Sequence, residues 1–103
     1  MFSNKTTEIV SEIRKFMSGQ PILRAWLFGS YSRGEETSAS DIDILVDFDH
    51  SKGLVSLFRM GGMLMDLEDL LGRKVDLVDN QGLMSFARES VERDKILIYE
   101  RPA

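Results

Sequence analysis

The sequence contains no cysteine and a single histidine, and both limits restrict its chemistry. Without cysteine there is neither a disulfide framework nor a thiolate nucleophile. His50 lies in an expected turn without neighbours typical of a metal ligand or base, so we interpret it as a surface residue. No apolar run reaches the roughly 20 residues that a membrane-spanning helix needs. Residues 1–7 also lack the charged-then-apolar layout of a signal peptide. We therefore expect a cytoplasmic protein without membrane contact.

Basic residues are outnumbered, since 13 Lys and Arg stand against 17 Asp and Glu, giving a net charge of −4 at pH 7. Strong non-specific binding to nucleic acid requires a basic surface, so we expect no direct nucleic-acid binding and no template-directed polymerase. A nucleotide substrate stays compatible with this charge, because metal ions can screen its phosphates from carboxylates. The length of 103 residues and the hydrophobic content of 43% predict one globular domain over residues 1–103.

Two carboxylates stand at strand spacing in the segment 40–46, which reads Ser-Asp-Ile-Asp-Ile-Leu-Val. Residues i and i+2 of a β-strand point to the same face, about 6.5–7 Å apart. Asp41 and Asp43 can therefore converge on one site, while Ile42 and Ile44 face a core. A carboxylate pair just after a loop suits a divalent metal. The spacing alone favours a plainer alternative, an acidic strand start on a solvated face.

A phosphate-binding turn is predicted just before this strand. Residues 26–28 are apolar and indicate the end of a buried strand, and Gly29 stands where that strand stops. Glycine can adopt a positive φ and lets a ligand approach the backbone. Ser30 then begins a short helix or turn whose free N–H groups and hydroxyl can bind phosphate oxygens. Arg33, one turn on, adds a cation. A lone Gly-Ser would indicate only a strand-to-turn break, whereas its combination with the carboxylate pair is specific.

The combined pattern resembles the signature of the DNA polymerase β-type nucleotidyltransferase superfamily. The residues that carry the resemblance are Gly29-Ser30, Arg33-Gly34 and Ser40-Asp41-x-Asp43 with the following Ile44-Leu45-Val46. The short chain is similar to the minimal nucleotidyltransferase (MNT) branch, over about Trp26 to Val78. The resemblance implies an α+β fold, a small mixed β-sheet with helices packed against it as in the polymerase β palm. It also implies a third carboxylate on a later strand. Asp76 has the right context, although its neighbours alone would indicate only an edge-strand charge.

An Mg²⁺-dependent nucleotidyltransferase is the activity that this resemblance implies. Such an enzyme moves a nucleoside monophosphate, most readily AMP from ATP, to an acceptor hydroxyl. Asp41 and Asp43 would hold two Mg²⁺ ions, and Asp76 would ligate one of them and help deprotonate the acceptor. Gly29, Ser30 and Arg33 would position the β- and γ-phosphates. Two metals about 3.5–4 Å apart can stabilise both the attacking and the leaving oxygens of an in-line displacement.

A chain of this length leaves no room for an acceptor-binding domain, so we expect a partner. The resemblance implies a helical HEPN-type toxin, with this chain as the antitoxin that adenylylates a tyrosine of the partner. Two alternatives stay open. One is a non-catalytic module that neutralises its partner by binding alone, and the other is a small-molecule, antibiotic-type nucleotidyltransferase completed by a partner chain. Transfer of a label from the nucleotide would distinguish the adenylylating antitoxin from a module that acts by binding alone. The identity of the labelled product separates it from the small-molecule enzyme.

Periodicity predicts helices over 4–17, 54–71 and 83–91, and strands over 22–28, 41–48, 73–79 and 96–99. Asn4, Thr6 or Thr7 is expected to cap the first helix. We interpret Asp47 and Asp49 as solvating a strand end. The apolar residues expected to face the core from the second helix are Leu54, Leu57, Phe58, Leu64, Leu67 and Leu71, and those from the third are Leu83, Phe86, Ala87 and Val91.

A methionine cluster in the second helix, formed by Met60, Met63 and Met65, is interpreted as core filling. An adaptable surface for a partner is the alternative.

Overall fold

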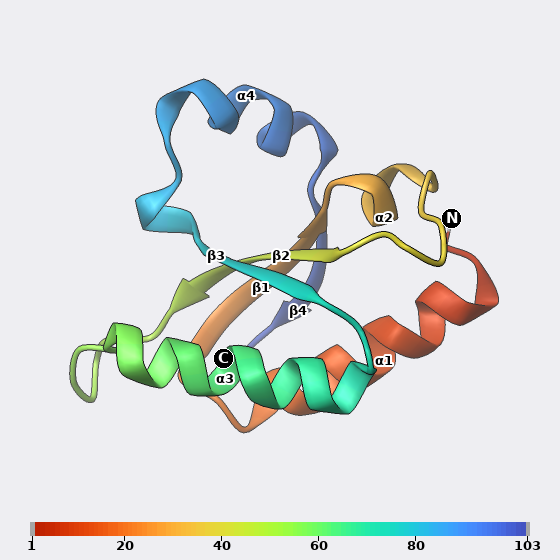
Figure 1. The fold of residues 1–103 in the computed structure, drawn as a ribbon. Helices are drawn as coiled ribbons and strands as arrows, with labels where there is room; N and C mark the ends of the chain where they lie inside the picture. Colours follow the sequence, from red (N-terminus) through yellow and green to blue (C-terminus); the bar gives the residue numbers. More distant parts are fainter. Residues whose placement is uncertain (1, 103) are drawn as a thin grey trace.

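A computed structural model describes residues 2–102, which form a four-stranded mixed sheet with helices packed against it (Figure 1). Met1 and Ala103, the ends of the predicted domain 1–103, lie outside the described residues. The elements in chain order are α1 (Asn4–Ser18), β1 (Ile22–Phe28), α2 (Ser30–Arg33), β2 (Ile42–Phe48), α3 (Leu57–Leu71), β3 (Val75–Asp79), the 3₁₀ turn η1 (Asn80–Gly82), α4 (Ser85–Asp94) and β4 (Ile96–Glu100). The predicted α+β fold with a small mixed sheet is confirmed.

The strands lie in the order β3-β2-β1-β4, and only β2 and β3 run parallel to each other. A parallel pair needs a long crossover connection, which α3 supplies between these two strands. Their register sets Asp43 opposite Asp76 and Ile44 opposite Leu77. Two acidic residues that are far apart in the sequence therefore become neighbours across one strand pair.

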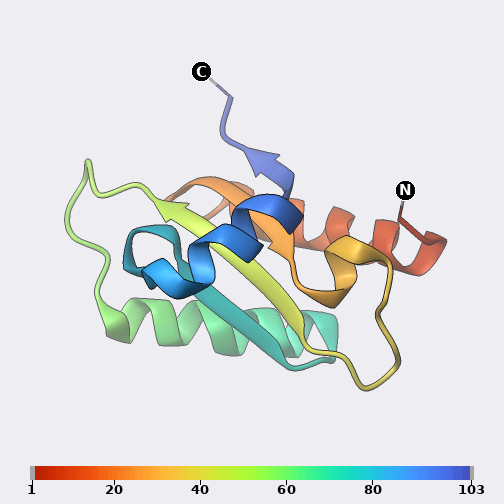
Figure 2. The same cartoon turned by 90° about the horizontal axis from the view of Figure 1, so that it is seen from above.

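The main core lies between the sheet and the two long helices, α1 and α3, which cover one face of the sheet (Figure 1). Ile42, Ile44 and Val46 of β2 are fully buried in it, as the strand alternation predicts. The apolar residues that α1 buries are Ile9, Val10, Ile13 and Met17. The helix α4 lies on the opposite face of the sheet, where it crosses the strands as a separate layer (Figure 2).

The first helix begins with a different cap from the one predicted. Ser3 is the N-cap, and its Oγ accepts a hydrogen bond of 3.1 Å from the backbone N–H of Thr6. The prediction of Asn4, Thr6 or Thr7 is therefore wrong, because the helix already includes all three. Several neighbouring residues have capping side chains, so the sequence leaves the starting point ambiguous by one residue.

The face of α3 that meets the core also differs from the predicted one. Leu54 lies in the loop before the helix, and Leu54, Leu57 and Phe58 are 85%, 86% and 93% exposed. The side chains that meet the core are Met63 and Leu67, with the half-buried Met60, Leu64 and Leu71 packed beside them. Core filling is thus confirmed for Met63 but wrong for Met65, which is mostly exposed. Apolar residues occupy two faces of this helix, so periodicity alone could not choose between them.

The last helix is later in the chain and less buried than predicted. Because η1 takes up residues 80–82, α4 begins at Ser85 and ends at Asp94. Val91 is the residue of α4 classed as buried, whereas Phe86 is 85% exposed and its predicted inward position is wrong. Arg88 holds the helix to the 3₁₀ turn by donating to the backbone oxygen of Asn80 at 2.9 Å. Among residues 2–102, no helix combines the length and apolar character needed to cross a membrane.

Candidate active site

Asp43 and Asp76 face each other from neighbouring parallel strands. Because Ile42 and Ile44 point into the core, Asp43 between them projects from the opposite face of the sheet. Adjacent strands lie about 4.7–4.9 Å apart, so the two carboxylate groups lie side by side on that face. Asp43 is half-buried and Asp76 is exposed. The sheet therefore presents a pair of acidic groups of which one is partly shielded from water.

Asp41 stands just outside the strand, because β2 begins at Ile42 and not at Asp41 as predicted. It is exposed, and its charge still acts on Asp43. Burial is the main cause that raises the pKa of Asp43 to about 6, and repulsion from Asp76 and then Asp41 adds to it. The nearby positive charge of Arg33 opposes this rise. Both other predicted carboxylates thus act electrostatically on Asp43.

These carboxylates suit a divalent cation by their chemistry and charge. A set made only of carboxylate oxygens is what hard cations such as Mg²⁺ prefer. A bound cation would also relieve the repulsion that raises the pKa of Asp43. In the described chain, however, no three acidic or histidine side chains close around a single point that could hold a metal. The carboxylates are suitable ligands for the cation, but in this conformation they do not surround a single metal position.

Gly29 forms the turn that the sequence predicts between β1 and the short helix. Its φ is 68° and its ψ −151°, a conformation that residues with a Cβ rarely adopt. The Oγ of Ser32 donates to the Gly29 carbonyl at 2.7 Å and fixes the turn. Ser30 begins α2 and is half-buried. The first N–H groups of a helix have no partner within it, so they can donate to an incoming anion.

Arg33, at the end of α2, is paired with two acidic residues. Its Nε donates to Glu35 at 2.8 Å, and its Nη1 donates to Asp94 of α4 at 3.1 Å. Both partners raise the pKa of Arg33. Asp94 also accepts from Arg93 at 3.1 Å, so one carboxylate is shared by two guanidinium groups. Arg33, which the sequence predicts to bind phosphate, therefore lies beside the turn, but its charge is neutralised by Glu35 and Asp94.

A pocket of about 310 Å³ lies between α2 and α4 and connects these groups. Its lining includes Gly29, Arg33, Arg93 and Asp94, together with Ser90 of α4. No sequence signal predicts that α4 contributes to this pocket. An Arg-Asp pair at the end of a helix, such as Arg93 and Asp94, is typical of a solvated surface. The fold places this pair in the same pocket as Gly29.

Asp47 at the end of β2 and Asp49 and His50 just after it have structural roles. Asp47 accepts hydrogen bonds from Arg24 at 3.1 Å and Asn80 at 2.9 Å. Hydrogen bonds from the Ser51 side chain and backbone N–H, together with the ion pair to Arg101, hold the pKa of Asp49 well below its usual range. The Nδ1 of His50 accepts from the Val55 N–H at 3.1 Å and closes the loop before α3. These three residues stabilise the fold at the far end of β2.

Residues 11–103 match the family model described as polymerase beta, nucleotidyltransferase. The chain belongs to this family. A proposed protein adenylyltransferase of Methanocaldococcus jannaschii is 41% identical over 73 residues, which cover 70% of this chain and 72% of the relative. The protein adenylyltransferase MntA of Thermococcus cleftensis is 40% identical over 72 residues, which cover 70% of both proteins.

Solved structures confirm the nucleotidyltransferase fold. A toxin–antitoxin structure with AMP-PNP matches with a TM-score of 0.76 and 24% identity, covering 89% of this chain and 73% of the other. A structure of a tri-AMPylated HEPN toxin of Shewanella oneidensis in complex with an MNT antitoxin matches with a TM-score of 0.62 and 22% identity. That match covers 94% of this chain and 71% of the other. A proposed minimal nucleotidyltransferase of known structure matches with a TM-score of 0.64 and 33% identity, covering 88% of this chain and 86% of the other, and confirms the resemblance that the motifs indicate.

Proposed function

We propose that this chain is a protein adenylyltransferase that transfers AMP from ATP to a hydroxyl of a HEPN-type toxin and so acts as the antitoxin of that partner. The observation that carries the proposal is the opposed pair Asp43 and Asp76, placed beside the positive-φ turn at Gly29. Relatives that are 40–41% identical bear the name protein adenylyltransferase. Complexes of the same fold include AMP-PNP or an AMPylated HEPN toxin. A cytoplasmic location, where ATP is available, belongs to the same proposal.

The carboxylates would hold Mg²⁺, with Asp43 and Asp76 as the central pair and Asp41 as the third ligand. Two divalent ions held by these residues would supply positive charge to the attacking and leaving oxygens. Asp76 is exposed and can receive the proton that the acceptor hydroxyl loses. The acceptor oxygen then bonds to the α-phosphorus, and the bond to the β-phosphate oxygen breaks, so that pyrophosphate leaves.

The turn at Gly29 and the start of α2 would receive the β- and γ-phosphates. Ser30 offers its hydroxyl and backbone N–H, and Arg33 offers a guanidinium once it leaves Asp94. The pocket between α2 and α4 lies beside this turn and has room for part of a nucleotide. Phosphate binding would thus replace an internal ion pair at the surface, and such exposed pairs contribute little to stability.

Co-expression with a HEPN-type protein that co-purifies with this chain, followed by intact-mass analysis, tests the proposal. The partner should gain one or more AMP units on tyrosine, and the gain should disappear with Asp43→Asn. Asp66→Asn is the matched control, because Asp66 is exposed on α3, away from Asp43. A stable complex whose partner remains unmodified with the wild-type chain would favour binding alone. Transfer to a small molecule only would favour the antibiotic-type enzyme.

A further inference from the structure

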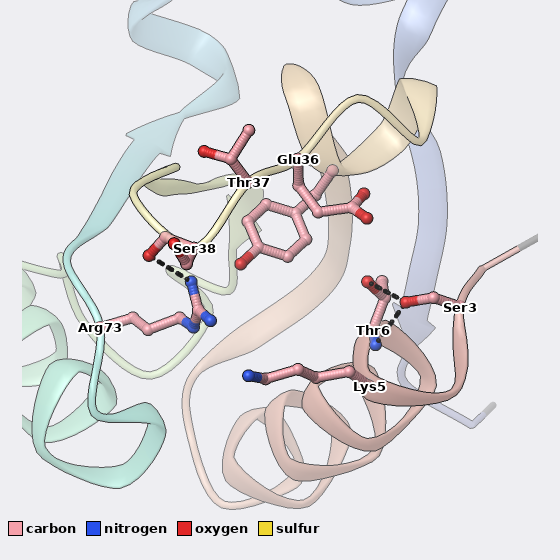
Figure 3. Close-up of a pocket in the computed structure, with 8 residues that line it drawn as sticks. Ser3, Lys5, Thr6, Glu36, Thr37, Ser38 and Arg73 are labelled. Carbon is pink, nitrogen blue, oxygen red and sulfur yellow. Dashed lines mark hydrogen bonds between the residues drawn. The ribbon is translucent and has the colours of Figure 1, made fainter.

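A second cluster of positive charge lies in a pocket of about 200 Å³ at the N-terminal end of α1 (Figure 3). The loop 34–41 and the segment before β3 complete its walls. The residues that line it are Ser3, Lys5, Thr6, Tyr31, Glu36, Thr37, Ser38 and Arg73. None of them lines the pocket between α2 and α4 or belongs to the carboxylate group around Asp43.

Lys5 and Arg73 extend toward the same space from two separate elements (Figure 3). Neither cation has an acidic partner within ion-pair distance in the part of the chain that the structure describes. Arg73 is held in place by donating to the Ser38 carbonyl at 3.3 Å. The acidic member of the lining, Glu36, turns its carboxylate away from both cations in Figure 3. In a protein with a net charge of −4, two unpaired cations facing one pocket attract an anion.

Tyr31 contributes a polar group that independently indicates a ligand. The residue is 3% exposed, and its hydroxyl makes no hydrogen bond within residues 2–102. Yet in those residues no fully buried side-chain oxygen or nitrogen lacks a partner. The hydroxyl therefore retains contact with open space in at least one of the two pockets that Tyr31 lines. A buried tyrosine normally pairs its hydroxyl, so this one is available to donate to an anion.

The first turn of α1 adds backbone donors to this pocket. The Ser3 side chain caps the N–H of Thr6, and the Thr7 N–H reaches the Ser3 carbonyl. The N–H groups of Asn4 and Lys5 lie before these capped positions, where a helix leaves its donors unsatisfied. The positive end of the helix dipole acts in the same direction as the two side-chain cations.

We propose that this pocket is an oxyanion site that binds a phosphate group through Lys5, Arg73, the Tyr31 hydroxyl and the start of α1. Its volume is below the about 300–1,000 Å³ of pockets that enclose drug-sized ligands, so it suits a phosphate or pyrophosphate and not a whole nucleotide. The bound anion would join α1, the segment before β3 and the loop 34–41, which leads from α2 to Asp41. The site needs no divalent metal and does not depend on the proposed adenylyl transfer.

Titration followed by amide NMR in the presence of EDTA tests this site with three probes, inorganic phosphate, pyrophosphate and AMP. Saturable shifts should appear at the amides of Lys5, Thr6 and Ser38, which line the pocket. Lys5→Met and Arg73→Met should each weaken binding on the order of tenfold, the loss expected for a charge-assisted hydrogen bond. Tyr31→Phe keeps the buried ring and should also weaken binding. Lys15→Met and Arg59→Met are the matched controls, because both residues are exposed away from this pocket.

The three probes separate the possible sources of the phosphate group. Tighter binding of inorganic phosphate or pyrophosphate than of AMP assigns the site to the free anion, and the reverse order assigns it to the phosphate of a nucleotide. Equal weakening by the control variants would mean unspecific attraction by charge and would overturn the proposal. Shifts confined to Gly29 and Ser30, or no shifts with a folded wild-type chain, would overturn it as well.

Discussion

Gly29 and Asp43 lie so close together that a methyl group on Gly29 would stand 3.1 Å from the carboxylate carbon of Asp43 and would overlap its Oδ2. The two residues come from different motifs, the turn after β1 and the start of β2. They meet because Phe28 and Asp43 are partners in the antiparallel register of these strands. The glycine turn and the carboxylate pair therefore form one unit in space.

Gly29→Ala should abolish binding of ATP in the presence of Mg²⁺. The new Cβ would displace the Asp43 carboxylate, and the φ of 68° disfavours any residue with a side chain. Isothermal calorimetry measures the affinity, and circular dichroism checks the fold. Gly61→Ala is the control, since a Cβ there meets nothing within 4 Å, and it should stabilise α3 by about 1 kcal/mol. Unchanged affinity in a folded Gly29→Ala variant would contradict the close fit.

Asp43→Asn should stabilise the metal-free protein at pH 7. The folded-state pKa of Asp43 is raised from 3.8 to about 6, so the folded chain binds more protons than the unfolded chain between these values. Its ionisation therefore lowers stability as the pH rises through this window. The gain for Asn is about 1–3 kcal/mol at pH 7, after allowance for solvent screening, and should vanish near pH 4. Urea unfolding with a chelator at both pH values measures it, and an equal effect at both would refute the assigned cause.

Asp94→Asn should tighten ATP binding a few-fold, because Arg33 and Arg93 then lose the carboxylate that pairs them beside Gly29. Arg33→Ala should have the opposite effect and raise KM more than it lowers kcat, as expected for a group that binds ground state and transition state alike. Steady-state kinetics with the partner complex gives both values. Asp69→Asn, on the exposed face of α3, serves as the control. Weaker binding in Asp94→Asn would mean that this carboxylate organises the arginines and does not compete with phosphate.

Leu67→Ala and Phe58→Ala should differ strongly in stability although both lie on α3. Leu67 is fully buried, so truncation should cost about 2–5 kcal/mol. Phe58 is 93% exposed, and its truncation should change the free energy of unfolding by no more than about 0.5 kcal/mol. Denaturant titration of the isolated chain compares the two. Similar large losses would mean that α3 packs through the face that the sequence pattern favoured.

Local signals in the sequence were sufficient where a single pattern dominated. Both ends of β1 were predicted, because Pro21 and Gly29 bound a mostly apolar segment whose charged residue is Arg24. Positive φ at Gly29 was expected from its place between a buried strand and Ser30, and the structure confirms it. The three acidic positions followed from strand spacing together with the family resemblance. Their catalytic and metal-binding roles stay predictions.

Long-range relationships were beyond the reach of the sequence pattern. The pairing of Arg33 with Asp94 joins residues on α2 and α4, and no local signal connects them. The buried face of α3 depends on how the helix lies on the sheet, since Phe58 and Leu67 are equally apolar candidates. The opposition of Asp43 and Asp76 required the parallel register of β2 and β3, which only the complete fold provides.

Incubation of the partner complex with Mg²⁺ and ATP labelled at either the α- or the γ-phosphate tests the central claim most directly. The account predicts that the α-label appears on the partner, that pyrophosphate is released and that the γ-label is not transferred. Asp41→Asn, Asp43→Asn and Asp76→Asn should each remove nearly all transfer while the complex still forms. Transfer of the γ-label, or full α-label transfer by the Asp43→Asn variant, would contradict the account.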